Sequence, residues 1–112
     1  MRDDLERLQD MLDAIARIEK YTQQGREAFE QQELIQTWMI YHLQIIGEAA
    51  RATSTNFKAR HSAIPWQNIA DFRNITVHEY FRVDLNIVWD VIQQNLPTLK
   101  HEIEAILQEP SP

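Results

Sequence analysis

The sequence predicts an all-α protein, an antiparallel bundle of about four to five helices. Apolar residues recur at steps of three and four over long stretches, which is the period of an amphipathic helix. The chain holds only two glycines and four prolines, too few turn residues for several short strands. Its 112 residues match the commonest domain size. We therefore expect residues 1–112 to form one domain, with a frayed tail at 109–112.

The first helix is predicted to begin after Asp3 or Asp4, either of which can cap a helix N-terminus. Its apolar stripe consists of Leu5, Leu8, Leu12, Ile15 and Ile18. The pattern fades over residues 21–25. Residues 26–32 are polar around a single phenylalanine, which indicates a short helix or a bend.

A long helix is predicted from about Gln32 to Thr53. One broad face of it carries Leu34, Ile35, Trp38, His42, Ile45, Ile46 and Ala49. The side chains around Gly47, Ala49 and Ala50 are small, so we expect another backbone to approach the helix closely there.

Residues 53–64 lose this periodicity and are predicted to be a loop. Pro65 suits the first turn of the next helix, because its missing N–H needs no partner there. That helix is expected to run to about Thr76, with Trp66, Ile69, Ala70 and Phe72 on its inner face. A junction follows at 78–83. Asp84 then caps a final helix, which Pro97 should kink or split.

The net charge of −6 argues against general coating of nucleic acids. The charge is unevenly spread, since residues 1–50 carry about −5, residues 51–82 about +3 and residues 83–112 about −4. The basic middle third contains Arg51, Lys58, Arg60, Arg73 and Arg82. Either it arises by chance, or it forms a small anion-binding zone in an acidic protein.

Arg73 and His78 form the most suggestive pair of residues for chemistry. A histidine titrates near neutral pH and can accept or donate a proton, whereas an arginine grips phosphate oxygens with two N–H groups. An Arg–His pair therefore suits the cleavage of phosphodiester bonds. In RNA the attacking group is the substrate's own 2′-hydroxyl, so RNA cleavage of this kind needs no metal. The two residues share no face of a continuous helix, so we expect a helix end near Thr76 or Val77.

The structural alternative is that Arg73 pairs with Asp71 or Glu79 and that His78 caps a helix. An arginine five residues before a histidine is common by chance, so the spacing alone is weak evidence for a catalytic site.

The segment from Arg73 to Tyr80 resembles the Arg-x4-His-x-Tyr motif of HepT-like proteins in the HEPN superfamily. Further short segments are similar to that family and extend the resemblance over most of the chain. They are Ile45–Ala49 in the long helix, Ile64–Trp66 and Ile69–Asn74 in the helix that bears the motif, and then Val83-Asp84, Val88-Trp89 and Leu96-Pro97.

This resemblance implies an HEPN-like helical bundle that forms homodimers, with two motifs facing one cleft. It implies a metal-independent endoribonuclease toxin of a type VII toxin–antitoxin system. Arg73 and His78 would be catalytic, with Asn74 supporting them. It also implies an antitoxin partner of the minimal nucleotidyltransferase type, which transfers AMP to Tyr80 and blocks the site. Four other cations would ordinarily be solvated surface charges, and the resemblance makes one or two of them weak candidates for contacts with RNA phosphates. They are Arg51, Lys58, Arg60 and Arg82.

The other histidines are less informative. His42 lies on the apolar face of the long helix and is best explained as a core or interface residue. His61 is a possible RNA contact. His101 with Glu104 is a possible ligand pair, but one pair does not make a metal site. We therefore expect no metal and no other cofactor. The tryptophans are expected in the core, with base stacking by Trp66 as the lesser alternative.

The absence of cysteine excludes disulfides and thiolate zinc sites and suits a cytoplasmic protein. The N-terminus has no apolar signal core, and no apolar run could span a bilayer. The alternative function is a non-catalytic HEPN scaffold that binds a nucleotidyltransferase. A bundle with some other ligand in its core is a third possibility. RNA, rather than DNA or a membrane, is the expected target.

Overall fold

The computed structural model describes residues 3–75 and 84–109. Within them lie α1 (Asp4–Thr22), α2 (Gly25–Gln31), α3 (Glu33–Ala52), α4 (Thr55–Arg60), α5 (Trp66–Ala70), the 3₁₀ turn η1 (Asp71–Asn74), α6 (Leu85–Asp90), the π turn η2 (Val91–Asn95) and α7 (Leu96–Leu107). The described residues contain no strand. The predicted all-α class is confirmed.

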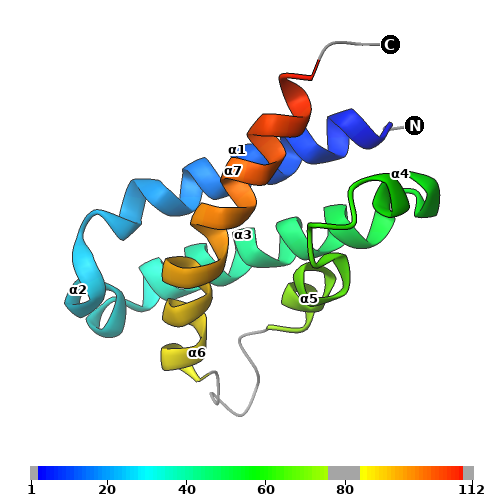
Figure 1. Cartoon of the computed structure of the whole chain (residues 1–112). Helices are drawn as coiled ribbons and strands as arrows, with labels where there is room; N and C mark the ends of the chain where they lie inside the picture. The colour runs from blue at the N-terminus through cyan, green and yellow to red at the C-terminus, as the bar shows by residue number, and fades with distance from the viewer. Residues whose placement is uncertain (1–2, 76–83, 110–112) are drawn as a thin grey trace.

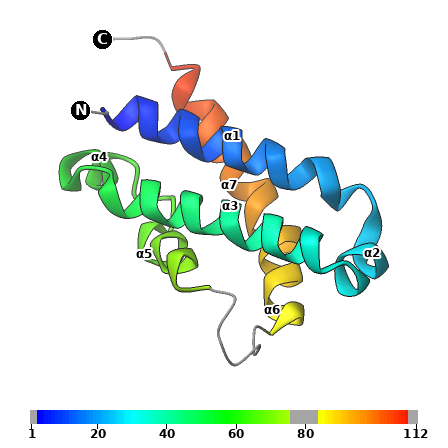
Figure 2. The ribbon, with the colours of Figure 1, turned by 180° about the vertical axis from the view of Figure 1, so that it is seen from behind.

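Two long antiparallel helices, α1 and α3, form the frame of the molecule, and α2 joins them at one end (Figure 1). The shorter elements α5, η1 and α7 pack on one face of this pair. Seen from behind, α1 and α3 lie in front of them (Figure 2). The core therefore forms between the α1–α3 pair and the shorter helices.

The apolar stripe of α1 is buried where α1 meets α3 and α7. Asp3 caps the helix by accepting a hydrogen bond from the Glu6 N–H at 2.8 Å. Leu8, Ile15 and Ile18 are fully buried, but Leu5 is 52% exposed. Leu5 lies in the first turn of α1.

Asp4 ties the start of α1 to the end of α3. Its carboxylate accepts hydrogen bonds from the Ser54 N–H at 2.8 Å and the Ser54 hydroxyl at 2.7 Å. Burial alone would raise the pKa of Asp4, but the Ser54 hydrogen bonds and the positive charges of Arg7 and Arg60 outweigh it. The pKa of Asp4 is therefore lowered, so this link contributes its full stability above the ordinary carboxyl pKa of 3.8 and loses it as the pH falls through the lowered pKa of the folded protein.

The predicted inner face of α3 is mostly correct. Ile35, His42 and Ile46 are buried, and Trp38 is partly buried, with its indole N–H bonded to the Arg17 carbonyl at 2.8 Å. Leu34 was placed on the same face, but it is 85% exposed. It lies at the beginning of the helix, one residue before the buried Ile35, and so points outward.

The segment 53–64 is not only a loop, because α4 occupies its middle. Ser54 caps this short helix by accepting a hydrogen bond from the Phe57 N–H. Phe57 is the buried residue that anchors it. A helix of six residues is too short to show a periodic pattern, which is why the sequence predicts only a loop here.

The helix that follows Pro65 is shorter than predicted. Its predicted inner residues, Trp66, Ile69, Ala70 and Phe72, are all buried. The α-helical turns stop at Ala70, and η1 ends at Asn74, before the predicted end at Thr76. Ile75 is already extended, with φ −77° and ψ 109°, in line with the low helix propensity of the β-branched run that it begins.

The final helical segment is split as Pro97 predicted. Asp84 caps α6 by accepting a hydrogen bond from the Asn86 N–H at 2.9 Å. Before Pro97 the backbone widens into η2, where the Leu96 N–H bonds to the Val91 carbonyl. A proline lacks the N–H for the usual bond and crowds the carbonyl four residues earlier, so the widened turn accommodates it.

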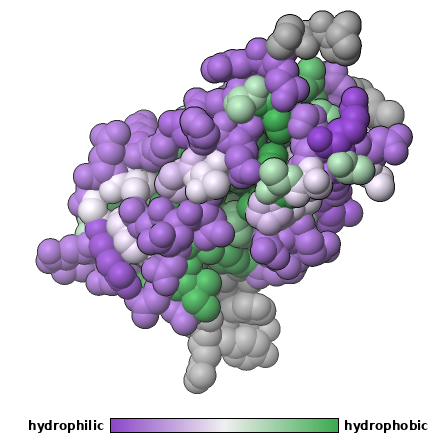
Figure 3. All heavy atoms as spheres, in the orientation of Figure 1, coloured by the Kyte–Doolittle hydropathy of each residue, from purple (hydrophilic) through white to green (hydrophobic). Residues whose placement is uncertain are grey.

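Hydrophilic side chains cover most of the face that carries α5 and α7, with apolar side chains between them (Figure 3). No described helix has the length and apolarity that a membrane crossing requires. Exposed large apolar side chains in the described part of the chain are Leu5, Leu34, Tyr41 and Ile87.

Gly47 is the point of closest approach between α3 and the segment that holds Arg73. A Cβ atom at this position would lie 2.4 Å from the Arg73 backbone N and 3.0 Å from the Ala70 carbonyl O. Both contacts are with backbone, which cannot move aside as a flexible side chain would. The prediction that another backbone approaches α3 here is confirmed.

We predict that Gly47→Ala lowers the free energy of unfolding by about 1–3 kcal/mol, the usual cost of overpacking a core. The loss should appear even though alanine favours a helix more than glycine does. Thr37→Ala is the matched control, because Thr37 is exposed on the same helix and should be neutral or slightly stabilising. Urea unfolding measures both, and a Gly47→Ala variant as stable as the wild type would contradict the close approach.

Candidate active site

Arg73 lies in the last turn of η1, directly after a residue that is anchored in the core. Phe72 is buried, whereas Arg73 and Asn74 are exposed. Figure 1 shows α5 beside the C-terminal half of α3. The buried residues of α5 and η1 thus fix the backbone, and the chain then presents Arg73 and Asn74 at the surface.

Two polar residues of α3 hold this end of η1. The Gln44 amide donates a hydrogen bond to the Ile75 carbonyl O at 2.7 Å. The Glu48 carboxylate accepts from Arg73 Nη1 at 3.5 Å, with 43% of the Arg73 side chain exposed. Gln44 and Glu48 are one helical turn apart and so share a face of α3. Gln44 thus holds the backbone at Ile75, and Glu48 makes a weak contact with the exposed guanidinium.

Three further predicted site residues lie outside the described residues, so their predicted roles stay predictions: His78, Tyr80 and Arg82. Asn74 follows Arg73 at the exposed end of η1. What the described residues provide is a half-exposed guanidinium on a rigid support, which can bind a phosphate with two N–H groups.

The structure separates the predicted RNA-binding cations into two groups. Arg51 Nη2 lies 3.4 Å from the same Glu48 carboxylate that contacts Arg73, and Lys58 Nζ donates to the Arg51 carbonyl O at 3.1 Å. Arg60 lies instead over the Phe57 ring, 5.6 Å from its centre. Arg51 and Lys58 are therefore associated with the Arg73 region, and Arg60 is packed elsewhere.

Sequence reasoning gave no role to Gln44 or Glu48. Glu48 lies within the family-like stretch Ile45–Ala49, and Gln44 lies just before it. The sequence does hold a signal for such contacts. Gly47 predicts a backbone beside α3, and Gln44 and Glu48 lie on the same face of the helix as Gly47. The identity of that neighbouring backbone is a tertiary fact that the spacing could not supply.

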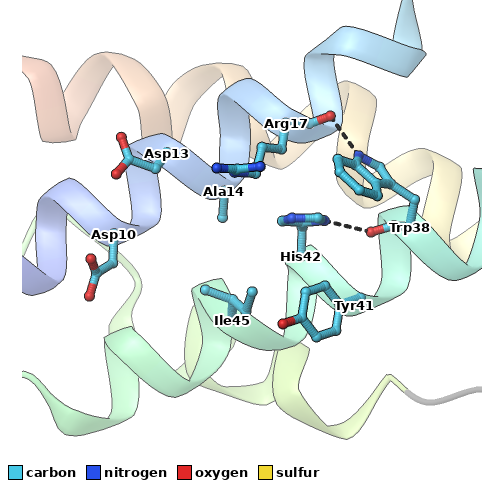
Figure 4. Close-up of a pocket in the computed structure, with 8 residues that line it drawn as sticks. All are labelled: Asp10, Asp13, Ala14, Arg17, Trp38, Tyr41, His42 and Ile45. Carbon is cyan, nitrogen blue, oxygen red and sulfur yellow. Dashed lines mark hydrogen bonds between the residues drawn. The ribbon is translucent and has the colours of Figure 1, made fainter.

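His42 is a satisfied core histidine, as expected. It is 4% exposed, and its Nδ1 lies 2.8 Å from the Trp38 carbonyl O, so Nδ1 carries the proton. Its ring borders a hollow of about 360 Å³ between α1 and α3 (Figure 4). A second hollow of about 340 Å³ on this pair of helices reaches Gln44 and Glu48.

His61 and Trp66 make structural contacts near the end of α4. His61 ends α4, and its ring packs 4.5 Å from the Phe57 ring. The buried Trp66 donates its indole N–H to the His61 carbonyl O at 3.0 Å, which leaves no ring face for a base. His101 is exposed on α7. In residues 3–75 and 84–109, no group of three or more potential ligands is placed to hold a metal ion.

Comparison with known proteins finds relatives of this chain. The chain is 36% identical over 103 residues to a Methanocaldococcus jannaschii protein named "Gamma-glutamylcyclotransferase and putative RNase". That match covers 91% of this chain but only 46% of the relative. The chain is 35% identical over 100 residues to "Probable ribonuclease HepT" of Thermococcus cleftensis, covering 88% of this chain and 91% of that one. No solved structure gave a match.

Residues 11–106 match the family model described as "Ribonuclease HepT-like". This range contains α3, η1 and the whole segment from Arg73 to Tyr80. The resemblance drawn from the motif is thereby confirmed, and the chain belongs to the HepT-like ribonuclease family of the HEPN superfamily.

Proposed function

We propose that this protein is a metal-independent endoribonuclease that cuts RNA with Arg73 and His78. The observation that carries the proposal is the guanidinium of Arg73, presented at the end of η1 on a backbone that Gly47 and Gln44 fix. Membership of the family and the names of the relatives support the ribonuclease activity. The role of His78 rests on its place in the motif.

In the proposed reaction the 2′-oxygen of a ribose attacks the adjacent phosphorus and the bond to the 5′-oxygen breaks. His78 removes the 2′-hydroxyl proton, the leaving 5′-oxygen takes a proton from water, and protonated His78 then returns its proton to the solvent. Arg73 binds the non-bridging oxygens and stabilises the negative charge that grows on them. Asn74, exposed beside Arg73, supports the phosphate or the histidine. The products are a 2′,3′-cyclic phosphate and a 5′-hydroxyl.

We predict that the purified protein cleaves single-stranded RNA in excess EDTA and that His78→Ala loses the activity by about 10²-fold or more, the usual contribution of a general acid–base group. His101→Ala is the matched control, since it removes an exposed histidine on α7 and should cleave as the wild type does. Gel analysis of a labelled RNA measures the rates.

The main alternative is a scaffold that binds a nucleotidyltransferase without cutting RNA. It would be favoured if wild type and His78→Ala both left RNA intact while mass spectrometry showed no AMP on the wild type. The acidic net charge of −6 gives that alternative some support, because it disfavours extended contact with RNA.

We further propose that the protein is a cytoplasmic toxin of a type VII toxin–antitoxin pair, silenced by AMP transfer to Tyr80. A nucleotidyltransferase partner would catalyse attack of the Tyr80 oxygen on the α-phosphorus of ATP, with pyrophosphate leaving. The added phosphate would bring negative charge close to Arg73 in sequence. It would then compete with the RNA phosphate for the same cation.

Tyr80→Phe should remain toxic when it is co-expressed with the nucleotidyltransferase partner, because phenylalanine has no oxygen to accept AMP. Tyr21→Phe is the matched control: the Tyr21 ring packs against the Trp38 ring, a contact that phenylalanine keeps, and this variant should be silenced like the wild type. Growth after induction is the measurement. Recovery of growth with Tyr80→Phe would contradict the proposed acceptor.

We also propose that the protein acts as a homodimer. The back of the α1–α3 pair is not covered by the other helices (Figure 2), and the exposed Tyr41 borders both hollows there. Light scattering should give about twice the chain mass of 13.3 kDa. A mass of one chain at micromolar concentration would exclude a stable dimer.

A further inference from the structure

A single carboxylate lies between two arginines at the C-terminal end of α3. Glu48 Oε1 is 3.5 Å from Arg73 Nη1, and Glu48 Oε2 is 3.4 Å from Arg51 Nη2. The two guanidiniums come from different elements, α3 and η1. One carboxylate thus holds two cations together that would otherwise repel each other.

A phosphodiester group has the same charge as this carboxylate and likewise offers two free oxygens. Arginine binds both groups through paired N–H donors. The three side chains are open to solvent, with 43% of Arg73, 52% of Glu48 and 56% of Arg51 exposed. An RNA strand can therefore reach both guanidiniums, and its phosphates can take over contacts that Glu48 makes in the free protein.

The backbone of Arg51 is also held by a residue of α4. Lys58 of α4 donates to the Arg51 carbonyl O at 3.1 Å, which places a third positive charge at this end of α3. Arg60, only two residues beyond Lys58, differs in its surroundings. It lies over the Phe57 ring and close enough to Asp4 to lower the pKa of that carboxyl.

From this geometry we propose that Arg51 binds an RNA phosphate next to the one bound by Arg73, and that Glu48 is the positioning residue that sets the two guanidiniums side by side. The inference rests on the proposed ribonuclease function and adds a second phosphate subsite to it. Glu48 has two opposing effects: it orients Arg73 for the reaction, and it partly neutralises the cations that attract RNA.

The first test measures the salt dependence of binding to a 2′-O-methyl RNA oligonucleotide, which cannot be cleaved by 2′-oxygen attack. Each phosphate contact contributes about 0.7 to the slope of log K against log salt for a single strand. Arg51→Gln should lose about that much slope, Arg51→Lys should retain it, and Arg60→Gln should match the wild type. Equal slopes for Arg51→Gln and Arg60→Gln would overturn the subsite.

The second test separates binding from turnover with Glu48→Gln, which keeps the shape of the side chain and removes its charge. We expect the oligonucleotide to bind several-fold more tightly, because Arg51 and Arg73 are no longer neutralised. We also expect kcat to fall several-fold, because Arg73 loses its orientation. A general loss of structure would weaken binding as well, so opposite changes mark a positioning role.

Unchanged binding and kcat in Glu48→Gln would overturn the positioning role while leaving the ribonuclease proposal intact. A wild type that binds the oligonucleotide but cuts no RNA would contradict the proposed reaction alone, since the binding test of Arg51 still applies. A wild type that neither binds nor cuts RNA would overturn both proposals.

Discussion

The arrangement of the candidate site depends on one close contact between two backbones. Residue 47 has no side chain, so η1 can lie directly against α3, at a distance that a Cβ atom would forbid. A glycine inside a helix costs about 1 kcal/mol relative to alanine, so the approach has a local cost. In return, Gln44 and Glu48 on either side of Gly47 come within reach of Ile75 and Arg73.

The contact also explains how an acidic protein can bring basic side chains together at one place. The overall charge of −6 repels a polyanion at long range, but beyond about 10 Å salt screens such forces at 0.1 M. Close to α3 the local arrangement dominates: Arg51 and Arg73 both contact the Glu48 carboxylate, and Lys58 donates a hydrogen bond to the Arg51 carbonyl O. In the proposed ribonuclease, such a cluster would favour a few phosphate contacts over extended coating of RNA.

Periodicity predicted the helices whose stability comes from burying a long stripe, such as α1 and α3. It failed where a few residues depend on tertiary contacts, as in α4, which one buried Phe57 anchors, and at η1, which ends two residues before the expected Thr76. Pairing of Glu48 with Arg73 was likewise not predictable, because 25 residues separate them. The motif pointed to Arg73, but only the fold showed which residues hold it.

The weakness of the Glu48–Arg73 pair is consistent with a role in binding. An exposed ion pair contributes about 0–1 kcal/mol to stability, so this contact adds little to the fold, which the buried residues of α3, α5 and η1 already maintain. A strong buried pair would hold Arg73 too tightly to exchange one anion for another. At 3.5 Å and half exposed, the guanidinium is oriented and can still transfer to a phosphate. Neighbouring residues of α3 would therefore have separate roles in the proposed enzyme. Gly47 and Gln44 hold the backbone of the Arg73 segment, and Glu48 would restrain the guanidinium until a phosphate replaces it.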